Sequence, residues 1–159
     1  MTEKEFRSII TPGRYHILVF TSPAMLYACF ARHPRIVLID DKGTIDRFEI
    51  KREKTKEQIG YSHFYHNRLP PREGLWWIKD KGGPRTHSKL VWHLEGDKDS
   101  QVKEMFDIIK KNIDVYPYKD TYRLYPGPNS NTFIQWILDK VPEWEISLPW
   151  NCIGKKYKQ

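Results

Sequence analysis

Two segments of the chain repeat apolar residues at helical spacing. In the first, positions i, i+3, i+4, i+7 and i+11 are apolar, which predicts a helix from a cap within residues 97–100 to about Asn112. In the second, an apolar face begins near Ser130 and continues until Pro142 ends the run. The two faces consist of Val102, Met105, Phe106, Ile109 and Ile113, and of Phe133, Ile134, Ile137, Leu138 and Val141.

Other segments have the composition of strands, because they are rich in β-branched and aromatic residues and are bounded by turn residues. The segment 21–32 opens on Thr-Ser-Pro and predicts a helix, in which Cys29 belongs to an apolar core face. A glycine turn at Gly43 predicts a hairpin. We predict strands at residues 15–20, 35–40, 44–51 and 88–94.

The second helix follows the most distinctive stretch of the sequence, Tyr-Pro-Gly-Pro-Asn-Ser-Asn-Thr-Phe at residues 125–133. Its prolines and glycine hold a non-helical approach, after which four small polar side chains meet the first turn. Such side chains ordinarily cap the unpaired N–H groups there, but a helix N-terminus also suits an anion. Two interpretations stay open: a cap, or a cleft in which Asn129, Asn131, Thr132 and Tyr125 bind a ligand.

The same helix start could take part in acyl transfer, which needs a nucleophile, a base and donors for an oxyanion. Ser130 is the candidate nucleophile, and the amides of Asn131 and Thr132 are candidate oxyanion donors. His16 is the candidate base if its strand packs against the helix start; otherwise it is a strand-end histidine with its own hydrogen bonds. The sequence selects no third group to orient the imidazole.

The middle of the chain, residues 61–78, is irregular and rich in aromatic rings and histidine. His63 and His66 are three positions apart, a spacing that serves a metal ion on a helix. The sequence places no third ligand beside them, so we predict no metal site and no cofactor.

The composition fits a single domain over residues 1–159, in which 6 Trp, 9 Tyr and 7 Phe help to close a core with 39% apolar residues. The formal net charge of +7 suits an anionic partner or simply keeps the protein in solution. No nucleic-acid-binding motif accompanies this charge, so we disfavour nucleic acid as a partner. The oligomeric state stays open.

Cys29 and Cys152 provide no disulfide framework. No segment has the ~20 apolar residues of a membrane-spanning helix, and the first residues lack the apolar core of a signal peptide. We therefore expect a soluble, cytoplasmic protein.

Residues 116–133, which end in Pro-Gly-Pro-Asn-Ser-Asn-Thr-Phe, resemble the signature of an uncharacterised bacterial family, domain of unknown function 3750. The early strand with His16, the Leu-Glu-Gly of residues 94–96 and the tail at residues 141–157 resemble that family as well. Residues 52–87 match it weakly. The resemblance implies no established activity.

The layout of that family is similar to the circularly permuted papain-like (NlpC-type) hydrolases and acyltransferases. This similarity implies an α+β fold, in which a small, mainly antiparallel sheet carries His16 and the helix at residues 131–141 packs on it. It matches His16 to the catalytic histidine, whereas Ser130 stands where those proteins carry cysteine.

Serine at that position leaves two functions open. The first, which we favour slightly, is a cleft that binds a peptide, a peptidoglycan or other cell-envelope fragment, or a small acyl or carboxylate ligand without covalent chemistry. The second is an amide or ester hydrolase, or an acyltransferase, that uses Ser130 and His16. The sequence therefore leaves open whether the protein is an enzyme.

Overall fold

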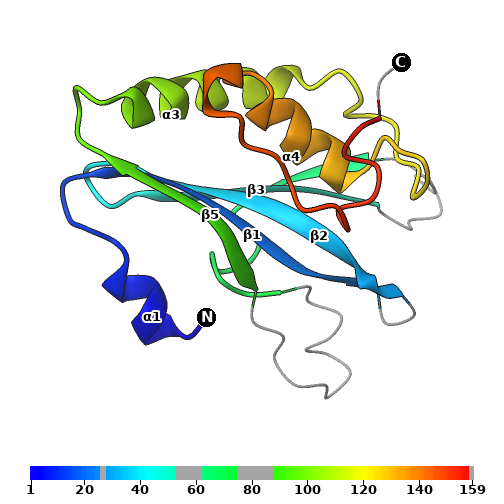
Figure 1. Cartoon of the computed structure of the whole chain (residues 1–159), viewed down its shortest axis with the longest axis horizontal. Helices are drawn as coiled ribbons and strands as arrows, with labels where there is room; N and C mark the ends of the chain where they lie inside the picture. Colours follow the sequence, from blue (N-terminus) through cyan, green and yellow to red (C-terminus); the bar gives the residue numbers. More distant parts are fainter. Residues whose placement is uncertain (26–27, 53–61, 75–87, 158–159) are drawn as a thin grey trace.

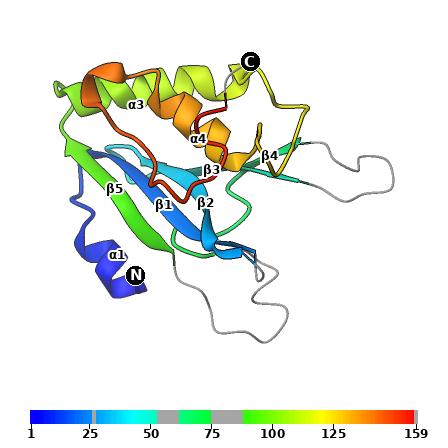
Figure 2. The same cartoon turned by 45° about the vertical axis from the view of Figure 1, so that its right-hand side comes forward.

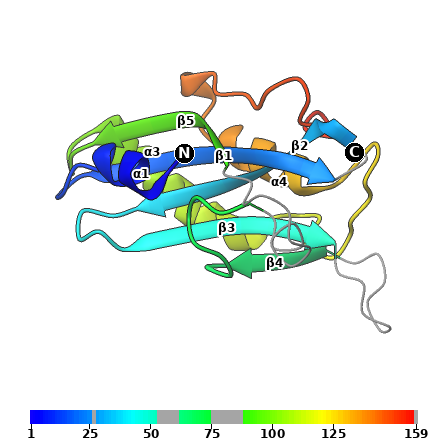
Figure 3. The ribbon, with the colours of Figure 1, turned by 90° about the horizontal axis from the view of Figure 1, so that it is seen from below.

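The computed structural model describes residues 1–25, 28–52, 62–74 and 88–157, which form an antiparallel sheet with helices on both faces (Figure 1). The strands lie in the order β4-β3-β2-β1-β5, which Figure 3 shows from the side of α1. The predicted α+β class with a mainly antiparallel sheet is therefore confirmed. The strands are β1 (Tyr15–Met25), β2 (Ala28–Ile39), β3 (Ile45–Arg52), β4 (Ser62–His66) and β5 (Lys89–Gly96).

The helices lie in two layers, with α3 and α4 on one face of the sheet and α1 against the other (Figure 1). The two helices predicted from apolar spacing are confirmed: Ser100 caps α3, and α4 begins at Ser130 as expected but ends at Leu138. Within the described residues, no helix is long and apolar enough to cross a membrane. The helices are α1 (Glu3–Ser8), α3 (Gln101–Asn112) and α4 (Ser130–Leu138), with short 3-10 turns at Ile113–Val115 and Pro142–Trp144.

The predicted helix at residues 21–32 is wrong, because β1 continues to Met25 and β2 begins at Ala28. Cross-strand pairing overrides the local helix signal here, with Ser22 opposite His33 and Pro23 opposite Arg32. Pairing of β1 with β5 within the described residues ends at Thr21, so Pro23 lies where a missing N–H is tolerated. Residues 26–27 and the side chain of Cys29 lie outside the described part.

The predicted hairpin between β2 and β3 is confirmed, and its turn shows why the register is fixed. The Asp40 carboxylate accepts hydrogen bonds from the N–H groups of Lys42 (3.0 Å) and Thr44 (2.7 Å). Gly43 supplies a φ of 81°, a conformation that glycine adopts without steric cost. The predicted strand before α3 is likewise confirmed as β5.

Alternation along β1 assigns its side chains to two separate cores. Ile17 and Val19 point toward α3 and α4 and join the larger core, whereas Leu18 and Phe20 join a smaller core with Phe6 of α1. His16 has the same parity as Leu18 and Phe20, so it lies on the α1 face. The side chain of His16 therefore points away from α4, the helix that carries Ser130.

Candidate functional site

The first turn of α4 is closed by Asn129, which acts as its N-cap. The Asn129 Oδ1 accepts hydrogen bonds from the N–H groups of Asn131 (2.9 Å) and Thr132 (3.3 Å). In return, the Asn129 N–H donates to the Thr132 hydroxyl at 3.0 Å. This reciprocal pair satisfies N–H groups that a helix start leaves without intrahelical partners. The capping interpretation therefore holds for Asn129.

The remaining donors of the same residues hold the C-terminal tail, residues 147–157. Asn129 and Asn131 both donate through Nδ2 to the carbonyl oxygen of Ile153, at 3.1 and 2.7 Å. The Thr132 hydroxyl donates to the carbonyl oxygen of Gly154 at 2.7 Å. Figure 2 shows the tail running back from the end of α4 toward its start. We call this set of contacts, from Asn129, Asn131 and Thr132 to Ile153 and Gly154, the tail clasp.

Ser130 lies within this turn and is 3% exposed, so it does not open into a cleft. Its neighbour is Tyr122. Burial raises the pKa of the Tyr122 phenol, while hydrogen bonds with the side chain and backbone of Ser130 oppose that rise. The serine hydroxyl therefore has a phenol as its partner.

His16 lies on the opposite face of the sheet from α4, so the structure does not bring Ser130 and His16 together. The His16 Nε2 is 3.0 Å from the carbonyl oxygen of Thr11, and its Nδ1 is 3.1 Å from Nε2 of His93. Those contacts match the alternative of a strand-end histidine with its own hydrogen bonds. The predicted pairing of Ser130 with His16 was wrong, because the sequence predicts the strand that carries His16 but not which face of the sheet the helix covers.

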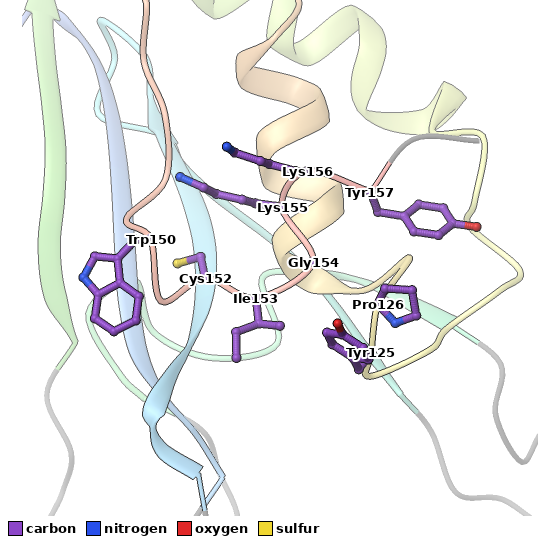
Figure 4. Close-up of a pocket in the computed structure, with 9 residues that line it drawn as sticks. All are labelled: Tyr125, Pro126, Trp150, Cys152, Ile153, Gly154, Lys155, Lys156 and Tyr157. Atoms are coloured by element: carbon purple, nitrogen blue, oxygen red, sulfur yellow. The ribbon is translucent and has the colours of Figure 1, made fainter.

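An open groove lies over the tail clasp, with a volume of about 510 Å³ (Figure 4). Tyr125 and Pro126 form one end and Trp150 the other, with residues 152–157 between them. We call it the tail groove. Of the predicted ligand-binding residues, Tyr125 lines this groove, whereas the side chains of the other three are engaged in the tail clasp beneath it.

The tail groove is aromatic at its ends and cationic along its length. Tyr125 and Trp150 are 80% and 83% exposed, and Lys155 and Lys156 extend side by side (Figure 4). The Lys155 ammonium donates to the hydroxyl of Ser147 and the carbonyl of Leu148. Burial raises the pKa of the Cys152 thiol to about 11, so this thiol is neutral. The sequence signal that we missed was Trp150, a tryptophan shortly before the basic segment at residues 155–158.

A second polar cluster is buried on the α1 face of the sheet. The Glu49 carboxylate is 3.0 Å from the Arg47 guanidinium, 3.1 Å from Nε2 of His33 and 3.5 Å from the Lys51 ammonium. Arg35 is fully buried beside them and donates to the Ser22 hydroxyl at 3.2 Å. This cluster was not predicted, although charged residues alternate with apolar ones along the sequence of β3.

Among the described residues, the cluster buries the Glu49 carboxylate beside three cationic side chains, and burial and charge shift the pKa values of several of its groups. Hydrogen bonding from His33 and the Arg47 charge hold the pKa of Glu49 far below its usual range despite burial. Burial lowers the pKa of His33, and burial together with the Arg47 charge lowers that of Arg35 to about 9. A neutral histidine and an ionised glutamate are therefore the stable forms.

The spacing of His63 and His66 would serve a metal ion only on a helix, but both residues lie on β4. On a strand, a separation of three positions does not bring two ligands to the same face. His66 bonds to Asp46 instead, with 2.6 Å between Nε2 and Oδ1. The His63 side chain lies outside the described residues. Within the described part, the ligand atoms of His16, His93 and Glu95 do cluster within 4.8 Å of one another.

Comparison with known proteins gives one family match and one structural likeness. The family described as protein of unknown function (DUF3750) matches residues 15–157. No curated protein matches. A crystal structure of the type VI secretion system effector TseH is similar at a TM-score of 0.45 and 14% identity, covering 88% of this chain and 81% of that chain. A likeness of this extent assigns no function.

Proposed function

Because the chain belongs to the DUF3750 family of proteins of unknown function, its role has to be argued from its own site, and we propose that it is a non-covalent binding module. Its ligand is a carboxylate-bearing peptide or acyl group, held in the tail groove between Tyr125 and Trp150. This is the binding function that the sequence favoured, moved from the helix start to the groove above it.

The observation that carries this proposal is the exposure of two large rings at the ends of one groove. Tyr125 and Trp150 each leave about four-fifths of their surface in water, at 80% and 83%. Exposed rings with a polar rim are typical of binding sites, because covering them removes a large apolar area from water. Contact with these rings would therefore contribute most of the affinity.

The lysines supply the second recognition element. Lys156 is exposed at the groove, while Lys155 is held by Ser147 and Leu148. An ammonium beside an apolar groove favours a ligand that joins an apolar body to a carboxylate, such as the end of a peptide chain. A peptide with a free C-terminus and a fatty or other acyl carboxylate both combine an apolar body with a carboxylate.

The tail clasp makes the groove floor rigid before the ligand arrives. Ile153 and Gly154 form part of the lining, and their carbonyl groups are fixed by the amides of Asn129 and Asn131 and the hydroxyl of Thr132. A preformed floor lowers the entropy lost on binding. Three residues predicted to bind the ligand, Asn129, Asn131 and Thr132, would instead hold the groove floor on which the ligand rests.

Covalent catalysis finds no support in this geometry. Ser130 is buried and bonded to Tyr122, and His16 lies on the other face of the sheet. The Cys152 thiol is buried and neutral at physiological pH. We therefore do not extend the proposal to the Ser130/His16 hydrolase.

The test is calorimetric titration of the protein with a short apolar peptide that carries a free C-terminal carboxylate. We expect measurable binding, at least about tenfold weaker in Trp150→Ala, since interface anchors of this kind each contribute more than ~1–2 kcal/mol. Lys156→Ala should reduce the preference for the free peptide over its C-terminal amide. Val115→Ala is the matched control, because it removes an apolar side chain that is 64% exposed and lies outside the groove lining.

Equal binding by wild type and Trp150→Ala would show that the groove is not the site. Equal affinity for the acid and the amide would reject the carboxylate as the recognised group. If a short-chain carboxylic acid binds as tightly as the peptide, the ligand is an acyl carboxylate rather than a peptide.

A further inference from the structure

Three metal-ligating side chains converge at the β1–β5 edge of the α1 face, away from the tail groove. His16 is fully buried, His93 is half-buried, and the Glu95 side chain is 27% exposed. The His16 Nδ1 lies 3.1 Å from Nε2 of His93 and 3.8 Å from Oε2 of Glu95. Figure 3 shows β1 and β5 side by side with α1 in front of them.

The hydrogen bonds of His16 determine which of its nitrogens is free to bind an ion. The carbonyl oxygen of Thr11, 3.0 Å from Nε2, only accepts, so Nε2 carries the proton. In the neutral imidazole this leaves a lone pair on Nδ1, the atom that faces His93 and Glu95. A backbone carbonyl that orients an imidazole in this way is the usual outer partner of a metal-bound histidine.

The same arrangement places two acceptors opposite each other. Without an ion, the His16 Nδ1 lone pair accepts a hydrogen bond from the proton on Nε2 of His93, 3.1 Å away, and Nδ1 lies 3.8 Å from the Glu95 Oε2. A cation between these atoms would replace that proton and attract both acceptors. Thr11 also donates through its hydroxyl to the same Oε2 at 3.1 Å, which fixes the carboxylate in this position. Both Glu95 and His16 are therefore oriented by Thr11.

The spacing of the three ligand atoms fits a zinc ion. Zinc binds histidine nitrogen and carboxylate oxygen at about 2.0–2.2 Å, which puts neighbouring ligands of a tetrahedron about 3.3 Å apart. The two separations from the His16 Nδ1, 3.1 and 3.8 Å, bracket that value, and all three ligand atoms lie within 4.8 Å of one another. We propose that His16, His93 and Glu95 form a zinc-binding site with two nitrogens and one oxygen. A water molecule would be the fourth ligand, because His93 and Glu95 are partly exposed.

Arg14 restricts an ion to one of the two oxygens of the Glu95 carboxylate. Arg14 lies beside the other Glu95 oxygen, with 3.2 Å between Nε and Oε1, and extends toward Asp97 at 4.0 Å. Arg14 thus occupies Oε1 and leaves Oε2 for the ion. On binding, the His93 proton moves from Nε2 to Nδ1, so neither imidazole needs to release a proton.

The experiment uses the full chain without a polyhistidine tag. Competition between the protein and a chromophoric chelator measures the zinc affinity, and cobalt substitution reports the coordination number through its visible absorption. We expect one zinc per chain and the intense cobalt spectrum of a four-coordinate site. His93→Gln and Glu95→Gln should each weaken zinc binding by more than the ~10–100-fold that loss of an outer partner causes.

His66→Gln is the matched control, since His66 is also a strand histidine bonded to a carboxylate, Asp46, but outside this cluster. It should bind zinc like the wild type. His93 is half-buried, so His93→Gln is expected to fold, and its thermal transition without zinc checks this. Wild-type zinc binding no tighter than that of folded His93→Gln, or loss of binding in His66→Gln alone, would overturn the proposal.

Discussion

Gly154 shows how closely the tail is fitted to the start of α4. Its φ is +89°, and a Cβ atom at this position would lie 2.4 Å from Nδ2 of Asn129. Real Cβ atoms do not approach that closely, and Asn129 cannot withdraw without losing its bonds to Leu124 and Ile153. One hydrogen atom in place of a methyl group therefore permits the tail clasp to form.

The first prediction is that Gly154→Ala lowers the free energy of unfolding by more than the ~1–2 kcal/mol that alanine costs in a left-handed conformation alone. The excess arises from the clash with Asn129. Chemical denaturation measures it. Gly43→Ala is the control, because Gly43 has a similar φ of +81° with open space around it. Equal losses in the two variants would show that the clasp relaxes easily.

At the scale of elements, strands β1, β2 and β3 carry polar side chains into the interior of the α1 face. Glu49 is a buried carboxylate between Arg47 and Lys51, with Arg35 buried nearby, so its charge offsets part of theirs. Removing one partner of a buried ion pair leaves an uncompensated charge and costs more than the pair contributes. We therefore expect this carboxylate to contribute to the stability of the α1 face of the sheet.

This cluster predicts acid sensitivity. Both His33 and Glu49 have a lower pKa in the folded protein than their ordinary values of 6.5 and 4.5, so the unfolded chain binds more protons as the pH falls. Stability should decrease below about pH 6.5 through His33, and further below about pH 4.5 through Glu49. Thermal unfolding across this range measures the profile.

Glu49→Gln keeps the shape of the side chain and removes its charge. We expect a loss of about 3–5 kcal/mol at neutral pH. The decrease below pH 4.5 should become shallower, because the variant has no carboxylate to protonate at that position. A variant with wild-type stability and an unchanged profile would contradict the role assigned to Glu49.

The sequence predicted elements whose signal is local. The stripe of α3 and the glycine turn between β2 and β3 follow from spacing and turn chemistry within a dozen residues. The continuation of β1 through Pro23 does not, because it depends on pairing with Arg32 on a later strand. Likewise, the local pattern predicted a cap among the small polar residues at the start of α4, which is Asn129 in the structure. The pairing of Ser130 with His16 was wrong, because the sequence does not show which face of the sheet α4 covers.

At the scale of the whole molecule, the sheet separates two proposed sites. The tail groove rests on α4 and the tail, while the zinc site lies at β1 and β5 on the α1 face (Figures 1 and 3). The β-sheet and its two cores lie between them. Residues that share no contacts and no network normally contribute independently.

The last prediction is that the two sites do not influence each other. Trp150→Ala should leave zinc affinity unchanged, and His93→Gln should leave peptide affinity unchanged, because neither side chain belongs to the other site. The double variant should bind zinc as weakly as His93→Gln and peptide as weakly as Trp150→Ala, each within about 0.5 kcal/mol. Titrating each protein with zinc and then with peptide measures this. A larger departure from additivity would show that the sheet transmits binding from one face to the other, and the two sites would then act as one coupled system.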